Sequence, residues 1–244
     1  MNAFEKYYDA AVGQLSRVFT TQRANIEQAA AWLGEALAND RWLYAFGTGH
    51  SHMLAEEIFY RAGGLAHAVP ILDDLLMLHR NAIDATHLER KEGYAATLLK
   101  QYPAGAGDVL IVASNSGRNA VPIELAMLGR ELGMKVVIIT NVAHTRGWPS
   151  RHSSGRKLAD TGDVVIDTCG VEGDATIELP RMPSAIGPTS SITGMFIVNA
   201  IIVQGIENAL SRGVAPEIYI SSNSNGDDHN DTLLHKYKSR IRHL

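Results

Sequence analysis

Cysteine, aromatic residues and long apolar runs are all scarce in this sequence of 244 residues. The single cysteine, Cys169, cannot form a disulfide within the chain, which fits a reducing cytoplasm and favours a small buried residue over a nucleophile. The longest apolar run near the C-terminus, residues 197–202, is far too short to span a bilayer. The first residues lack a basic stretch followed by an apolar run, so the sequence predicts no signal peptide.

The chain also lacks a marked excess of either charge. With 22 basic and 26 acidic residues its net charge is -4, which provides no basic surface for nucleic acid or for an anionic membrane. Hydrophobic residues make up 45% of the chain, enough for the core of one large α/β domain with an appendage. We therefore expect a cytoplasmic protein with neither a nucleic-acid nor a membrane partner.

Residues 44–57 have the pattern of a buried strand, a glycine turn and a helix. Gly47 and Gly49 allow backbone angles and close approaches that a Cβ atom would block, and Ser51 stands where a helix N-cap is expected. A helix N-terminus attracts anions, because its N–H groups are free and its dipole end is positive. Two interpretations remain open: an anion held over this turn, or a simple connection between strand and helix.

A second polar loop follows the strand 108–113 and precedes a helix over 120–132. Open α/β sheets bind ligands at the carboxyl ends of their strands, where serine hydroxyls and asparagine amides can bind phosphate oxygens. Ser114 and Asn119 could also serve only as a turn and a helix cap. Two such loops after two strands favour the ligand interpretation. The polar stretch comprises Ser114, Asn115, Ser116, Gly117, Arg118 and Asn119.

The pair of motifs G-x-G-x-S and S-x-S-G resembles the sugar isomerase (SIS) domain family from about residue 25 to residue 213. The run GTGHSHMLAEEIFYRAGG is most similar to stand-alone bacterial SIS proteins that carry the label of phosphosugar isomerases. The resemblance implies a site for a phosphorylated sugar and an aldose–ketose isomerisation of it. The predicted phosphosugar-binding residues are Gly47, Gly49, Ser51, His52, Ser114, Asn115, Ser116, Gly117, Asn119 and Ser190.

Strands alternate with helices along the whole chain, which predicts a three-layer αβα sandwich with a flavodoxin-like parallel five-stranded sheet. Thr86 and Glu89 have the spacing of a capping box, so we expect a helix from there to about Gln101. The other expected elements are helices over 4–38, 52–61 and 192–210, a short helix after Asp73, strands at 42–46, 66–71, 108–113, 135–140 and 164–167, and an edge strand near 176–179.

The chain divides into an SIS phosphosugar-binding domain over 1–213, with N-terminal helices, and a tail over 214–244. The tail carries apolar residues that would dock on the domain or on a partner subunit. SIS domains usually dimerise or form tetramers, so the resemblance implies a homodimer or a tetramer.

Sugar phosphate isomerisation needs a base and donors for a developing oxyanion. Glu57, with Glu56 as its alternate, and His50 are the candidates close to the first loop, and His229 in the tail is a fourth candidate. His52 and Glu56 are four residues apart and so can face each other on a helix. Each of these residues could also be an ordinary surface side chain.

The resemblance does not supply the base. Relatives carry a glutamate at the opening of the last core helix, where this chain reads Thr189, Ser190 and Ser191. The first loop also resembles phosphoheptose isomerases, but Glu57 stands where they have a histidine. An alternative function is therefore a non-catalytic sugar-phosphate sensor or carrier.

No cofactor and no metal are predicted. His50, His52, a glutamate and His229 could ligate a metal, but no compact H-x-x-x-H or C-x-x-C motif supports such a site. A dinucleotide site, ranked last, would need glycine at His52, although Asp73 or Asp74 follows at a suitable distance of about 20 residues.

Overall fold

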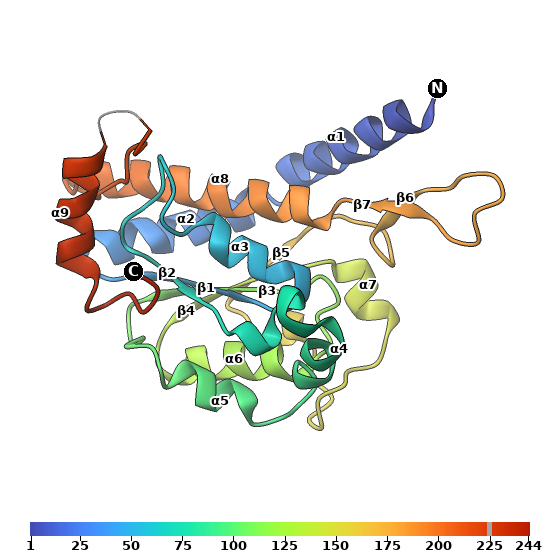
Figure 1. Cartoon of the computed structure of the whole chain (residues 1–244), viewed down its shortest axis with the longest axis horizontal. Helices are drawn as coiled ribbons and strands as arrows, with labels where there is room; N and C mark the ends of the chain where they lie inside the picture. The colour runs from blue at the N-terminus through green and yellow to red at the C-terminus, as the bar shows by residue number, and fades with distance from the viewer. Residues whose placement is uncertain (224–225) are drawn as a thin grey trace.

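The computed structural model describes residues 1–223 and 226–244. Its centre is a five-stranded sheet in which every neighbouring pair of strands is parallel and the order is β2-β1-β3-β4-β5 (Figure 1). The predicted flavodoxin-like sheet is thereby confirmed. The strands are β1 (Leu43–Gly47), β2 (Ala68–Ile71), β3 (Val109–Ala113), β4 (Lys135–Thr140) and β5 (Val164–Asp167).

Helices cover both faces of the sheet, which explains why its strands are apolar throughout. Successive side chains of a strand point to opposite faces, so Leu43 belongs to one core cluster and Tyr44 to the other. The first face packs against α2 (Arg23–Ala38), α3 (His52–Glu57) and α8 (Ser190–Leu210). The second packs against α5 (Tyr94–Leu99) and α6 (Ala120–Glu131).

Among the described residues, α8 is the one helix long and apolar enough to cross a membrane by length and composition alone. Its packing gives another reason for that composition. A Cβ atom on Gly205 would lie 2.7 Å from Leu33 Cδ2, and one on Gly34 would lie 2.5 Å from Asn208 Cβ. Glycines on both helices therefore allow α2 and α8 to approach closely, and Ile197, among other residues of α8, is buried against the sheet.

The N-terminal helix α1 (Ala3–Thr21) begins with a capping box between Asn2 and Glu5 and extends beyond the sheet (Figure 1). Beside it lies a hairpin of β6 (Ala175–Ile177) and β7 (Ile186–Pro188), held by a 2.7 Å hydrogen bond from the Tyr7 hydroxyl to the Pro188 carbonyl. The expected edge strand near 176–179 was therefore misplaced. It pairs with β7 in a separate antiparallel ribbon and does not join the main sheet.

Two helix predictions were wrong in extent. The helix after the first loop ends at Glu57 and not at residue 61, and the helix expected over 86–101 is split between α4 (Leu78–Leu88) and α5. The Thr86 hydroxyl donates to the Ala82 carbonyl inside α4, so the capping box with Glu89 does not form. The remaining elements are η1 (Gly49–Ser51), η2 (Asp74–Leu76), whose cap is Asp73 as expected, α7 (Val142–Gly147), η3 (Leu158–Asp160) and α9 (Asp227–Tyr237).

The C-terminal segment lies on the same domain. Leu233 and Tyr237 of α9 and the later Ile241 are buried with Trp42, and the rings of Trp42 and Tyr237 meet edge to face at 5.2 Å. The Asn230 amide bonds to both the N–H and the carbonyl of Ile220, like a short strand pairing. The sequence predicts a short basic helix over 231–241, and α9 begins and ends four residues before those bounds, at Asp227–Tyr237.

Candidate functional site

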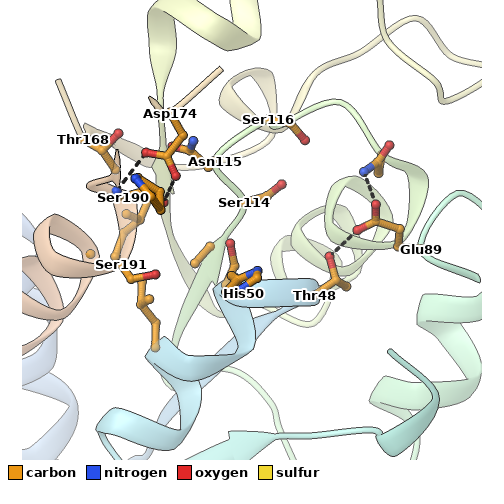
Figure 2. A pocket seen from close by; sticks show the side chains of 17 residues that line it. Thr48, His50, Glu89, Ser114, Asn115, Ser116, Thr168, Asp174, Ser190 and Ser191 are labelled. Carbon is orange, nitrogen blue, oxygen red and sulfur yellow. Dashed lines mark hydrogen bonds between the residues drawn. The ribbon is translucent and has the colours of Figure 1, made fainter. Parts of the chain in front are cut away.

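A cavity of about 300 Å³ opens beyond the carboxyl ends of β1 and β3, at the point where the two strands lead to opposite sides of the sheet (Figure 2). This volume is at the lower end of the range for small-molecule sites. The cavity joins residues that are far apart in the sequence, from Thr48 to Gly194. The sequence-predicted residues that line it are His50, Ser51, Ser114, Asn115, Ser116, Asn119 and Ser190.

The first loop turns sharply because of its glycines. A Cβ atom on Gly47 would lie 2.3 Å from the Ser51 carbonyl oxygen, and Gly49 has a φ of +55°. The following 3₁₀ turn, η1 (Gly49–Ser51), brings Ser51 into the cavity lining. Ser51 was expected to cap the helix, but within the described chain its side chain makes no cap hydrogen bond. The His52 ring bonds back to the Gly49 carbonyl and lies 3.6 Å from Glu56, so it is not part of the lining.

The second loop is held from beneath by two threonines that the sequence did not single out. The Thr140 hydroxyl donates to the Ser114 carbonyl at 2.7 Å, and the Thr145 hydroxyl donates to the Ser116 carbonyl at 3.1 Å. Gly117 has a φ of +59°, and a Cβ atom there would lie 2.6 Å from the Thr145 hydroxyl. These bonds fix the loop so that the side chains of Ser114 and Ser116 face the cavity (Figure 2).

Two buried polar atoms in the lining have no hydrogen-bond partner among the described residues. They are the side-chain oxygens of Asn115 and Thr168. A buried polar atom left unpaired destabilises a fold, so such atoms at a cavity wall are suited to the hydroxyl groups of a ligand. Thr168 follows β5 and was not predicted from the sequence.

Glu89 forms one wall of the cavity together with Thr48 and Asn119. Its carboxylate accepts hydrogen bonds of 2.7 Å from the Thr48 hydroxyl and of 2.7 Å from the Asn119 amide. Burial raises the pKa of Glu89, and the Thr48 hydrogen bond and the positive charges of Arg90 and Arg151 offset part of that rise. This role could not be predicted from the sequence, because Thr48 and Glu89 are brought together only by the tertiary fold.

Asp174 stands on the opposite wall (Figure 2). Its carboxylate accepts from the backbone N–H groups of Thr189 at 3.2 Å and Ser190 at 2.9 Å, and from the Ser190 hydroxyl at 2.5 Å. An acidic group from another segment thus caps the N-terminus of α8, where its charge is favourable. The sequence placed the opening of α8 at the site but did not identify Asp174.

Helix α1 also supports this wall. The fully buried Gln14 donates to the Thr168 carbonyl at 2.7 Å and accepts from the Thr189 hydroxyl at 2.5 Å. One side chain thereby ties α1 to the residue that follows β5 and to the start of α8.

Three of the four predicted catalytic residues do not line the cavity in the described chain. Glu57 accepts a 2.8 Å bond from Asn199 and pairs with Arg61, and Glu56 is exposed beside His52. The His229 ring lies 2.9 Å from the Ile218 carbonyl in the tail. His50 does line the cavity, and Gly47, Gly49 and Gly117 shape the two loops.

Residues 6–141 match the family model described as the SIS domain. The chain is 42% identical over 236 residues to UPF0309 proteins of Listeria innocua and of Listeria monocytogenes, a match that covers 96% of each chain. It is 38% identical over 242 residues to a UPF0309 protein of Caldanaerobacter subterraneus, with 98% of each chain covered.

Solved structures share the fold at low sequence identity. The phosphoheptose isomerase of Neisseria gonorrhoeae superposes with a TM-score of 0.52 at 18% identity, over 81% of this chain and 94% of that one. The NanR protein of Vibrio vulnificus, solved in complex with ManNAc-6P, superposes with a TM-score of 0.53 at 17% identity, over 100% of this chain and 70% of that one.

Proposed function

The chain belongs to the SIS domain family, and from that premise we propose that its cavity binds a phosphorylated sugar and that the protein interconverts the aldose and ketose forms of it. The observation that carries this proposal is the cavity itself. Two polar strand-end loops meet there beside Glu89, a carboxylate whose pKa is raised by burial.

The phosphate is assigned to the space between the two loops. Ser51, Ser114 and Ser116 supply hydroxyl donors, and the N–H groups near Gly117 and Asn119 lie at the start of α6, where an anion is favoured. The Arg151 guanidinium donates to the Asn119 side chain at 2.9 Å and so adds positive charge close to this place. The sugar hydroxyls would then pair with Asn115, Thr168 and Ser190.

Glu89 is proposed as the group that moves the proton. Its carboxylate takes the proton from the carbon beside the carbonyl, the C–H electron pair forms the C=C bond of an enediolate, and the carbonyl π pair moves to oxygen. Return of the proton to the former carbonyl carbon, with proton exchange between the two oxygens, gives the isomer. A raised pKa makes Glu89 a stronger base than an ordinary glutamate. His50 is the proposed partner for the oxygens.

The second candidate function is binding without catalysis, as in a sensor or carrier of sugar phosphates. Two observations favour it: the opening of α8 carries Thr189, Ser190 and Ser191 in place of a glutamate, and the fold is similar to that of NanR, which was solved with a sugar phosphate. The two functions share one cavity and differ only in whether a carbon–hydrogen bond is broken.

Proton exchange distinguishes them. The protein is incubated in D₂O with a panel of aldose and ketose phosphates, and binding and deuterium incorporation are followed together by NMR. Isomerisation predicts deuterium at the carbon beside the carbonyl of one sugar phosphate, and loss of that exchange in Glu89→Gln. Saturable binding of a sugar phosphate without deuterium exchange would support binding without catalysis. Stabilisation by NAD or NADP alone would contradict both candidate functions.

We further propose a cytoplasmic homodimer or tetramer, with His229 as a candidate to reach a neighbour's cavity. Apolar side chains stand exposed on α1, where Phe4 is 77% and Phe19 is 61% exposed, and on α8, where Val203 is 69% exposed. Their burial between subunits would remove apolar surface from water. Light scattering tests the assembly, and activity recovered on mixing inactive Glu89→Gln and His229→Ala subunits would support a shared site.

A further inference from the structure

A cluster of three metal-ligating side chains lies outside the cavity, beside the loop that carries Arg151. The cluster comprises Glu92 after α4, Glu124 on α6 and His152, and their possible ligand atoms all lie within 4.8 Å of one another. We propose that Glu92, Glu124 and His152 form a binding site for a divalent transition-metal cation, with Zn²⁺ as the best-matched ion.

The spacing of the three atoms fits a metal better than a hydrogen bond. His152 Nε2 lies 3.5 Å from Glu124 Oε1 and 3.9 Å from Glu92 Oε2. An N–H···O bond needs roughly 2.7–3.2 Å, whereas two ligands of a tetrahedral Zn²⁺, each bound at about 2.1 Å, stand about 3.4 Å apart. The His152 side chain is only 10% exposed, and its Nε2 has no hydrogen bond among the described residues. The nitrogen of a largely buried ring thus faces two carboxylate oxygens at 3.5 and 3.9 Å.

Hydrogen bonds orient each ligand from behind. His152 Nδ1 lies 2.7 Å from the Ser154 hydroxyl and also accepts the Ser154 N–H at 3.2 Å, so ligation of a metal through Nε2 would require the proton on Nδ1 and the loss of that N–H bond. The Gly93 N–H donates to both oxygens of Glu124, at 2.8 and 2.9 Å. The backbone and hydroxyl groups of Ser153 donate to Glu92 at 2.6 and 2.7 Å. The two carboxylates are therefore oriented before an ion binds, and Glu92 would have to approach His152 from 3.9 Å to reach the spacing of two zinc ligands.

The charges of the ligands also favour a cation at this site. Glu92 and Glu124 bring two carboxylates to one place, and a divalent cation would neutralise the charge of both. Imidazole together with carboxylate suits Zn²⁺ or Mn²⁺ better than Mg²⁺ or Ca²⁺, which prefer oxygen ligands alone. Three protein ligands leave a fourth position for water.

The proposed ion would fasten the loop that follows α7. The site joins this loop to α6 and to the segment after α4. Arg151, which directly precedes His152, donates a hydrogen bond to Asn119 in the cavity lining. The ion would act as a positioning element that holds Arg151 against the cavity. The metal site itself rests on Glu92, Glu124 and His152 and not on the proposed function.

Titration of chelator-treated protein with Zn²⁺ alone, by calorimetry and without any sugar phosphate, tests the site. We expect one saturable site and a rise of Tm on binding. His152→Ala and Glu124→Gln should each weaken binding by at least about tenfold. The matched control His235→Ala removes an exposed histidine of the tail and should bind as the unaltered chain does.

Glu124→Gln keeps an oxygen that can accept from the Gly93 N–H, so it remains folded if His152→Ala does not. The proposal would be overturned by any one of three results. These are unaltered Zn²⁺ affinity in Glu124→Gln, loss of the single site in His235→Ala, and the absence of saturable Zn²⁺ binding. Saturable binding of Mg²⁺ in place of Zn²⁺ would overturn the role of His152. Because no sugar is present, failure here leaves the proposed function untouched, and failure of sugar binding leaves the metal site untouched.

Discussion

The two carboxylates on opposite walls of the cavity are held in different ways. Glu89 accepts from two neutral side chains, those of Thr48 and Asn119, and burial raises its pKa. Asp174 accepts from two backbone N–H groups and a hydroxyl at the start of α8. The same chemical group thus serves a helix terminus on one wall and, in the proposed function, is the base on the other. What surrounds a carboxylate, more than its presence at a cavity, decides which of these roles it takes.

Replacement of Glu89 should have the largest effect. Glu89→Gln keeps an oxygen acceptor but removes the base, so we expect turnover to fall by roughly 10²–10⁴-fold with nearly unchanged sugar phosphate binding. Steady-state rates and calorimetric affinity measure the two separately.

Glu57→Gln is the matched control, because Glu57 does not line the cavity and is bound by Asn199. It should remain active. If Glu89→Gln were fully active and Glu57→Gln inactive, the role of base would return to Glu57, the residue predicted from the sequence.

Ser116 should affect affinity more than turnover. Ser116→Ala removes a hydroxyl that faces the cavity, and the loss of a hydrogen bond to a charged phosphate should weaken binding by about 1–3 kcal/mol. Calorimetry with the sugar phosphate, and with its unphosphorylated sugar, measures the change. An equal loss for both sugars would place the phosphate elsewhere, and unchanged affinity in both Ser116→Ala and Ser51→Ala would remove the proposed phosphate site.

Asp174 should matter for stability. Asp174→Ala removes the acceptor for two N–H groups at the start of α8, and the loss of such a cap costs about 0.5–2 kcal/mol of unfolding free energy. Urea unfolding followed by circular dichroism gives the value. If Asp174→Asn kept the normal free energy of unfolding but lost turnover as completely as Glu89→Gln, Asp174 would be needed for turnover and not for stability, contrary to this comparison of the two walls.

The sequence predicted the sheet and both loops because their signals are local. The apolar strands that lead to Gly47 and to Ser114 show in the sequence where each polar loop begins. Because the strands are parallel, their carboxyl ends lie at the same edge of the sheet. Glu89 could not be predicted in this way. It meets Thr48 across 41 residues of sequence, and its spacing from Thr86 imitates a capping box that the structure does not form. Asp174 and the metal-ligating cluster likewise depend on contacts between distant segments.

The smallest predicted effect is a shift in the pH profile. The Thr48 hydroxyl donates to Glu89 and lowers its pKa, partly offsetting the rise caused by burial. Thr48→Val removes that donor and should raise the pKa of Glu89 further. A base acts only when deprotonated, so activity is lost as the pH falls through this pKa, and the acid limb of kcat/KM should move to higher pH in Thr48→Val. Thr48→Ser keeps the hydroxyl and should leave the limb in place. A limb that stays fixed in Thr48→Val, while Thr48→Ser is equally active, would mean that another group titrates there, and Glu89 would then lose its assignment as the base.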